Sequence, residues 1–99
     1  MTNNINYVMS KLINELEEII RWHKKPSDKD AVIKYLATKF ESDKKYTEKE
    51  INGIIKRHHL FNDTPLLRRE LVSRKLLCRT DDGSAYWKIR SASLEPLFI

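Results

Sequence analysis

Segment 63–89 reads DTPLLRRELVSRKLLCRTDDGSAYWKI and contains two different patterns in succession. The first predicts a short basic helix over 64–75, because Leu67 and Leu71 lie one helical turn apart and can face the same side. Proline is favoured at the start of a helix, so Pro65 fits there with either of the two residues before it as the cap. We expect the two leucines to face the core.

Segment 76–89 predicts a β-hairpin directly after this helix. Asp82-Gly83 favours a two-residue type I′ turn, which places Cys78 opposite Trp87. A longer turn that begins one residue earlier would shift this register. Side chains alternate between the two faces of a strand, and we expect the tryptophan face to pack on the core. The face expected in the core holds Leu76, Cys78, Thr80, Ala85, Trp87 and Ile89, and the face expected at the surface holds Leu77, Arg79, Tyr86 and Lys88.

Segment 4–23 predicts one long amphipathic helix. Its apolar residues recur at the spacing of one helix face. They are Ile5, Met9, Leu12, Leu16 and Ile19. This stripe either covers the chain's own core or joins a second copy as a homodimer, and the sequence leaves both interpretations open. We expect Trp22 in the core, and Pro26 ends the helix because proline disfavours helix in the residue before it.

Two more helices are expected between these segments. The first runs over 28–41 with Ser27 as its N-cap. Its inner face holds Val32, Ile33, Leu36, Ala37 and Phe40. The second begins at a capping box, in which Thr47 and Glu50 each bond the backbone amide of the other. Gly53 lies inside this second helix, where we expect another backbone to approach closely.

The order of these elements predicts a mainly helical α+β fold. We expect a winged helix-turn-helix, with three core helices and a C-terminal β-hairpin, preceded by an extra N-terminal amphipathic helix. The expected divisions are the N-terminal helix over 1–25, the winged-helix domain over 26–90 and a tail over 91–99. A length of 99 residues suits one such domain.

The composition narrows the function classes. The chain has 19 basic and 14 acidic residues, hence a net charge of +5, which favours an anionic partner. Its single cysteine excludes an internal disulfide and suits a reducing compartment. No apolar run approaches the roughly 20 residues that span a membrane, and no secretion signal is visible. We therefore expect a cytoplasmic protein that has no membrane contact.

Three linked motifs resemble a known family. They are YTEKEIN at 46–52, LRRELV at 67–72, and Gly83 followed by Tyr86-Trp87. The similar family is a bacterial domain family of unknown function, which is described as winged-helix-like and is sometimes fused to arsenic-repressor-type transcription regulators. The resemblance covers residues 24–90 and implies the fold more than the function. One departure is that three residues separate Asp63 from the second motif, where the family has little between its aspartate and that motif.

The leading hypothesis is a DNA-binding transcriptional regulator. From Arg68 to Arg79 the chain carries five basic residues and one acidic residue. Such a cluster suits phosphate contact, and arginine also reads guanine edges. For Arg68, a salt bridge to Glu48, Glu50 or Glu70 remains an alternative. The residues expected to contact double-stranded DNA are Arg68, Arg69, Ser73, Lys75, Arg79, Tyr86 and Lys88.

The alternative hypothesis is a winged-helix module that binds a protein or senses a ligand without binding DNA. In that case the arginines are structural. We expect no enzymatic activity, because the chain has two glycines and no glycine-rich phosphate loop, and the serine-rich stretch 91–93 has no base near it. The spacing of His58, His59, Asp63 and Cys78 matches no zinc pattern. We therefore expect no catalytic residue, no metal and no cofactor.

Overall fold

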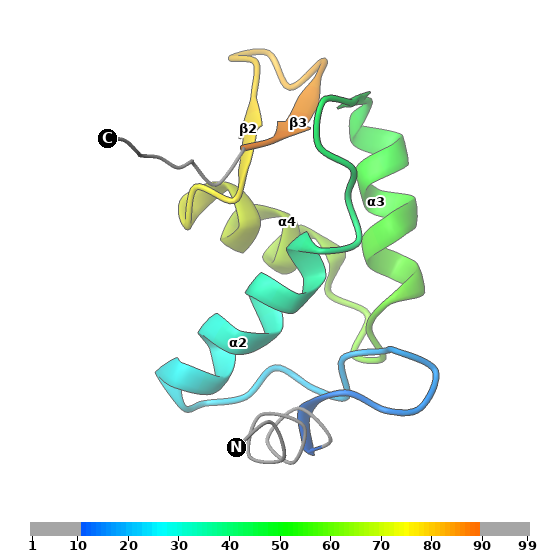
Figure 1. Ribbon diagram of the computed structural model, residues 1–99, viewed down its shortest axis with the longest axis vertical. Helices are drawn as coiled ribbons and strands as arrows, with labels where there is room; N and C mark the ends of the chain where they lie inside the picture. Colours follow the sequence, from blue (N-terminus) through cyan, green and yellow to red (C-terminus); the bar gives the residue numbers. More distant parts are fainter. Residues whose placement is uncertain (1–10, 90–99) are drawn as a thin grey trace, which may run out of the picture.

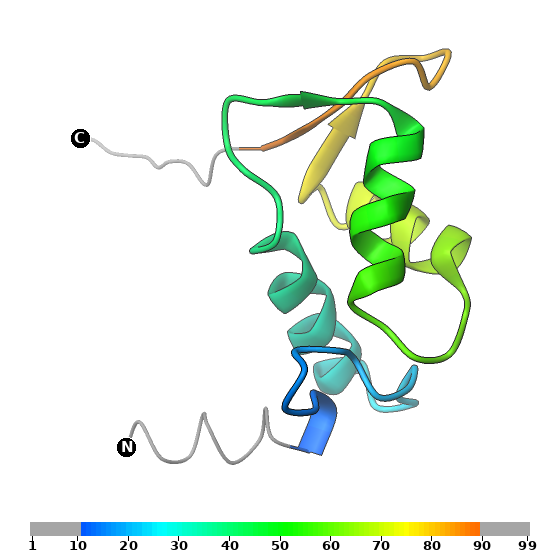
Figure 2. The same ribbon diagram turned by 90° about the vertical axis from the view of Figure 1, so that its right-hand side faces the viewer.

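The computed structural model describes residues 11–89, which form one α+β unit (Figure 1). Three helices of ten residues or more lie in this range: α2 (Pro26–Ala37), α3 (Glu48–Arg57) and α4 (Thr64–Ser73). Three short strands, β1 (Lys45–Tyr46), β2 (Leu77–Arg79) and β3 (Tyr86–Lys88), form an antiparallel sheet with β3 in the middle. The sheet lies at one end of the molecule, above the helices (Figure 2). The predicted α+β class is confirmed.

The core lies where the helices meet the inner face of the sheet. α4 contacts both α2 and α3, so it is the helix around which the others pack. The side chains of Leu36, Ile51, Ile55, Leu67 and Leu71 have no solvent exposure. Burying an aliphatic side chain of this size contributes about 1.5–3 kcal/mol. The inner residues predicted for α2 and α4 are therefore confirmed.

The ends of α2 differ from the prediction. The helix begins at Pro26 with Lys25 as its N-cap, not at 28 with Ser27. Proline is tolerated at the first helical position because the amide it lacks would have no partner there. The helix also stops at Ala37, four residues earlier than expected. The amides that follow it donate to the carbonyl three residues before them and not four, so the α-helical pattern ends. The amide of Thr38, for example, bonds the carbonyl of Tyr35 at 3.0 Å.

The start of α3 confirms the predicted capping box. The Glu50 amide donates to Thr47 Oγ1 at 3.1 Å, and the Thr47 amide donates to Glu50 Oε1 at 2.8 Å. The expectation for Gly53 is wrong. A Cβ atom there would meet only the far end of Arg57, at 3.8 Å, so no backbone approaches closely.

The long helix predicted over 4–23 does not continue past Leu12 within the described residues. Asn14 uses its side-chain oxygen to accept hydrogen bonds from the amides of Leu16 and Glu18, both at 2.9 Å. Such local bonds compete with helix formation. Glu17 then adopts a left-handed conformation with φ 66°. Residues 13–25 are therefore an irregular strap, and residues 4–10 of the prediction lie outside the described range.

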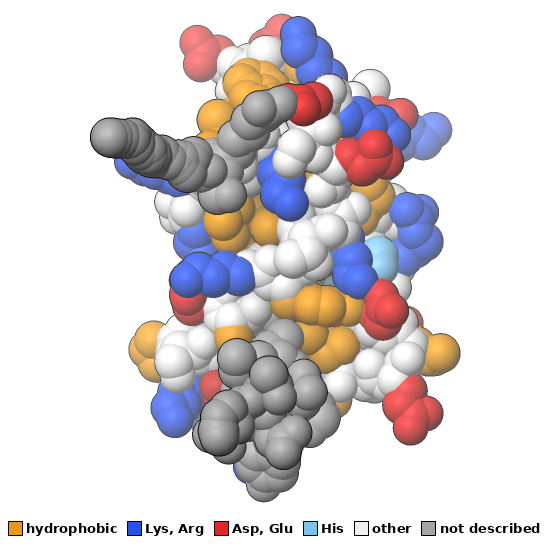
Figure 3. Space-filling view, in the orientation of Figure 1, with side chains coloured by type: hydrophobic (Ala, Val, Ile, Leu, Met, Phe, Trp, Pro, Cys, Tyr) orange, Lys and Arg blue, Asp and Glu red, His pale blue; other side chains and the backbone are white. Residues whose placement is uncertain are grey.

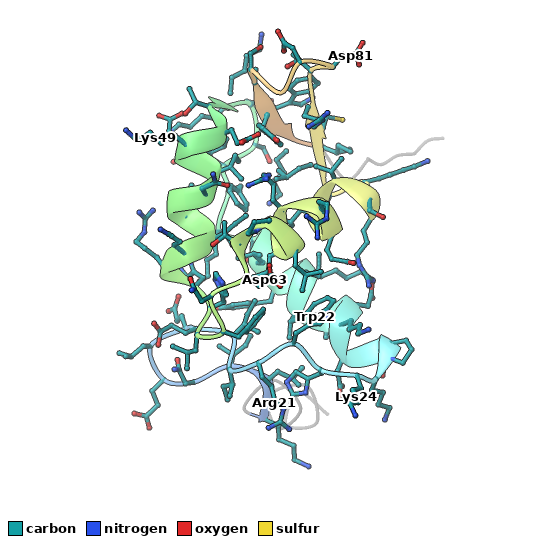
Figure 4. All side chains as sticks on the ribbon, turned by 180° about the vertical axis from the view of Figure 1, so that it is seen from behind. Arg21, Trp22, Lys24, Lys49, Asp63 and Asp81 are labelled. Atoms are coloured by element: carbon teal, nitrogen blue, oxygen red, sulfur yellow. The ribbon has the colours of Figure 1, made fainter. Side chains whose placement is uncertain are left out.

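The strap 13–25 is held against the α3–α4 turn (Figure 1). The Ile19 amide donates to the His58 carbonyl at 2.7 Å, and the Leu60 amide donates to the Ile19 carbonyl at 3.0 Å. Ile19 is fully buried, whereas Leu16 is 76% exposed. Trp22 packs against the core as expected, and Figure 4 shows it beside α2. The division of the chain at residue 25 stays a prediction.

The hairpin keeps the predicted register, since Cys78 is opposite Trp87. Its turn is longer than predicted. The Thr80 amide bonds the Ala85 carbonyl at 3.0 Å, and residues 81–84 form a four-residue loop between them. Asp82 holds this loop together, because its carboxylate accepts hydrogen bonds from the Ser84 amide and the Thr80 hydroxyl. Those bonds favour the wider loop over a two-residue turn.

The predicted faces of the hairpin are wrong. Leu77 and Tyr86 are each 1% exposed and belong to the core, whereas Cys78 and Trp87 are half-buried on the other face. The way α4 ends accounts for this. The amide of Lys75 bonds the Val72 carbonyl and that of Leu76 bonds the Leu71 carbonyl, which is a Schellman motif. It sets the direction in which the chain enters β2, and a change of one residue in phase exchanges the two faces of a strand.

Among residues 11–89, no helix has the length and apolar character needed to cross a membrane.

Candidate nucleic-acid interface

A surface hollow of about 420 Å³ lies between α4 and the hairpin. α4 contributes four of its lining residues and the two strands of the hairpin contribute one each. Its lining residues are Arg68, Arg69, Val72, Ser73, Arg79 and Tyr86. Five of the seven residues predicted as a DNA-binding site are therefore brought together in one place. Val72, which the prediction omitted, supplies an apolar part of the wall.

One edge of α4 faces the hollow because the opposite side of the helix is buried in the core. Leu67 and Leu71 are fully buried, and Asp63 caps the helix by accepting a hydrogen bond from the Leu66 amide at 3.3 Å. Arg69 and Ser73 lie four residues apart and share one exposed edge. This edge is the part of α4 that a ligand can reach.

Arg68 is held by α3 and not by a carboxylate. Its Nη1 donates to Oδ1 of Asn52 at 2.5 Å. The three glutamates considered as its partners have other hydrogen bonds. Glu48 accepts from Tyr86, Glu50 closes the capping box, and Glu70 pairs with Arg74. The guanidinium at the rim of the hollow is thus fixed in position by an amide oxygen and has no carboxylate partner among residues 11–89.

Arg79 faces the hollow from β2. It is exposed, and its Nη2 donates to the Asp81 carbonyl at 3.4 Å. A Cβ atom built on Gly83 would lie 3.7 Å from Arg79 Nη1 and 3.6 Å from Glu48 Oε1. The Arg79 side chain therefore lies back along the hairpin loop. Gly83 has φ 74°, a conformation that glycine adopts without strain.

Tyr86 is not the exposed aromatic that the sequence predicted. It is 1% exposed, and its hydroxyl donates to Glu48 Oε1 at 2.9 Å. This bond joins the middle strand of the sheet to the first turn of α3. The Tyr86 ring forms the floor of the hollow, so its main role is to position the hairpin against the helices.

The charges around the hollow are not neutralised. Residues 11–89 contain four ion pairs, and none of them includes Arg68, Arg69 or Arg79. Arg74, a basic residue between them on the chain, pairs with Glu70 at 2.9 Å and with Asp30 at 3.1 Å. Three guanidinium groups therefore surround one hollow without a carboxylate partner, an arrangement that favours an anion with several oxygens.

The two remaining predicted residues lie elsewhere. Lys75 is exposed, but it follows the end of α4 with φ 64°, in the Schellman turn and not on the helix. Lys88 points to the segment that follows α2, where its Nζ lies 3.4 Å from the Phe40 carbonyl oxygen. Neither residue lines the hollow.

The tip of the hairpin is acidic. Figure 4 shows Asp81 at this tip, away from Asp63 at the start of α4. Asp82 lies beside it. Hydrogen bonds from the amide and the hydroxyl of Ser84 and from the hydroxyl of Thr80 lower the pKa of the Asp82 carboxyl to about 2. The tip is therefore negative at neutral pH and does not suit an anion, whereas the side of the hairpin that carries Arg79 does. In the described part of the chain, no group of three or more His, Cys, Asp or Glu side chains is placed to hold a metal ion.

Comparison with known families gives one match. Residues 18–88 match a family described as an uncharacterized protein conserved in bacteria (DUF2087). The match covers most of the chain and includes the second half of the strap, every helix named above and the whole sheet. No curated protein and no solved structure matches the chain.

Proposed function

The chain therefore belongs to this bacterial family, and we propose that it is a cytoplasmic DNA-binding protein of the winged-helix type that regulates transcription. In this proposal α3, the turn after it and α4 form the helix-turn-helix, and α4 enters the major groove. The β2–β3 hairpin is the wing and contacts the backbone beside the groove.

The observation that carries the proposal is the set of three arginines around the hollow. Arg68 and Arg69 come from α4, Arg79 comes from the hairpin, and none has a carboxylate partner among residues 11–89. A nucleic-acid backbone supplies closely spaced phosphates to such a surface. Arg69 is exposed and has no hydrogen-bond partner within the described range, so it is the residue best suited to reach a phosphate or a guanine edge.

The first experiment titrates a labelled duplex of random sequence with the protein at low and at moderate salt. Binding driven by phosphates has a dissociation constant of roughly 10⁻⁴–10⁻⁶ M and weakens steeply as salt rises. We expect both properties. Absence of binding at low salt would contradict the proposal and favour the alternative, a winged-helix module that binds a protein or senses a ligand and in which the arginines are structural.

A pair of double variants separates a local site from the effect of overall charge. Arg69→Glu with Arg79→Glu reverses two residues of the hollow, and Arg21→Glu with Lys24→Glu reverses two exposed residues at the other end (Figure 4). Each pair lowers the net charge from +5 to +1. We expect only the first pair to abolish binding.

The salt dependence gives a second measure on milder variants. Each phosphate contact contributes about 0.9 to the slope of log K against log salt concentration. Replacing Arg69 and Arg79 by alanine should therefore reduce the slope by about 1.8. Equal binding and equal slopes in the hollow and control variants would show that α4 is not the recognition helix.

A homodimer through residues 4–23 is a separate proposal. It needs an apolar stripe that a second copy can reach. Among the described residues of that stripe, Leu12 and Ile19 are instead buried in the chain's own core. Sedimentation of the full chain tests it against the monomer mass of 11.8 kDa. A mass that stays at this value at high protein concentration would exclude the dimer.

A further inference from the structure

The outer face of the sheet carries a second, larger hollow of about 680 Å³. Three side chains cross it in a row, one from each strand, because Lys45 and Cys78 are both opposite Trp87. Ala85 and Ile89 lie on the same hollow. Trp87, Cys78, Ala85 and Ile89 are each half-buried. No described residue covers this apolar floor, and Figure 3 shows apolar side chains reaching the surface near the hairpin.

Positive charge borders this outer hollow. Lys44, Lys45 and Lys88 line it with one acidic residue, Asp43. Lys88 is fixed by the Phe40 carbonyl, and Lys44 lies 5.0 Å from the centre of the Tyr46 ring. An occupant that suits the hollow is therefore apolar with a negative charge beside its apolar part. A second copy of the same face would bring lysines against lysines.

We propose that residues 94–99 of the same chain occupy this outer hollow. They read LEPLFI, which combines four large apolar side chains with Glu95. The apolar side chains match the floor formed by Trp87 and Cys78, and Glu95 complements the lysines on the rim. This inference does not depend on DNA binding.

The attachment point of this segment supports the assignment. Ile89, the last described residue, itself lines the hollow, so the segment 94–99 is tethered at its edge. The four residues between them span at most about 13–14 Å when extended. Two strand spacings amount to about 10 Å, so this linker is long enough to return across the sheet. Pro96 has no amide to donate, which suits binding by side chains to the face and not pairing as a further strand.

The reactivity of Cys78 shows whether residues 94–99 occupy the outer hollow. It is the only cysteine of the chain and lies on the floor of this hollow. The test measures its rate of alkylation by iodoacetamide in the folded full-length protein. Leu97→Asp with Phe98→Asp should raise this rate by about fivefold or more, as expected for losing about 1 kcal/mol of docking free energy. Ser91→Asp with Ser93→Asp adds the same charge outside the apolar part and should not raise the rate, because added carboxylates are attracted to the lysines on the rim.

Glu95→Lys is the second variant, chosen because it alters no apolar contact. It should raise the alkylation rate by about two- to threefold through repulsion by the three lysines. A synthetic peptide of residues 90–99 should slow alkylation of the Leu97→Asp, Phe98→Asp protein again. Equal rates in all variants would overturn the proposal. A wild-type rate that falls as protein concentration rises would also overturn it, because a second copy would then be the cover.

Discussion

Arg68 on α4 donates a hydrogen bond to Asn52 on α3, with 2.5 Å between Nη1 and Oδ1. The two residues are 16 positions apart, and the bond fixes the angle at which a guanidinium enters the hollow between α4 and the hairpin. It also distinguishes two neighbouring arginines that the sequence alone does not. Arg68 is a positioned group, whereas Arg69 beside it is exposed and available to a ligand.

Asn52→Ala removes the acceptor of this bond. We expect the free energy of unfolding to fall by about 1.5–3 kcal/mol, as for other hydrogen bonds to charged groups. Arg69→Ala should change it by less than about 0.5 kcal/mol, because an exposed side chain without a partner is lost. Urea unfolding followed by circular dichroism measures both. An equal loss in the two variants would show that the Arg68–Asn52 bond does not contribute to stability.

Tyr86→Phe removes the hydroxyl that joins β3 to Glu48 on α3. The loss should be about 1 kcal/mol in the free energy of unfolding, because the Tyr86 side of the bond is buried although Glu48 is exposed. Tyr35→Phe is the matched control, since its hydroxyl bonds the Glu17 carbonyl at an exposed site and its loss should have a smaller effect. If Tyr86→Phe lowered DNA binding without lowering stability, Tyr86 would be a contact residue as the sequence suggested.

Ile19→Ala and Leu16→Ala test the strap. Both residues belong to the apolar stripe predicted from the sequence, but Ile19 is fully buried and Leu16 is 76% exposed. Ile19→Ala should lower the free energy of unfolding by about 2–4 kcal/mol, and Leu16→Ala should change it by less than about 0.5 kcal/mol. Equal effects in thermal or urea unfolding would instead support a continuous amphipathic helix.

Gly53→Ala should stabilise the protein. Gly53 lies inside α3, and the added methyl group meets only a flexible arginine end, at 3.8 Å. Replacing glycine by alanine in a helix interior gains about 0.5–1 kcal/mol. The expected result is a higher midpoint of thermal unfolding. A lower midpoint would mean that another backbone does approach this face of α3.

Asp82 predicts a pH dependence of stability. Hydrogen bonds lower the pKa of its carboxyl in the folded protein from 3.8 to about 2. A carboxyl whose pKa is lower when folded stabilises the protein above its ordinary pKa, and this contribution is lost as the pH falls towards the folded value. The stability difference between wild type and Asp82→Asn should therefore shrink between about pH 4 and pH 2.

Unfolding by urea at several pH values measures this difference. Asp81→Asn serves as the control, because it removes the neighbouring carboxylate on the same loop. A difference that stayed constant from pH 5 to pH 2 would contradict the role assigned to Asp82.

The sequence alone determined the features that depend on neighbouring residues. The capping box of Thr47 and Glu50, the buried leucines of α4 and the hairpin register all follow from short-range spacing, because the groups that interact are a few residues apart. Most of the candidate site could also be predicted from neighbouring residues. Arg68, Arg69 and Ser73 lie on one helix, and Arg79 lies on the strand that follows it.

Only the tertiary structure decided the features that depend on distant partners. The spacing of apolar residues did not show that Asn14 would end the N-terminal helix, or that Ile19 would bond the backbone of His58 and Leu60, about forty residues away. The hairpin has two faces, each with an aromatic residue, and their alternation does not say which one meets the helices. The Schellman turn at Lys75 and the contact of Tyr86 with Glu48 made that choice, because a strand is oriented by what packs on it and not by its own pattern.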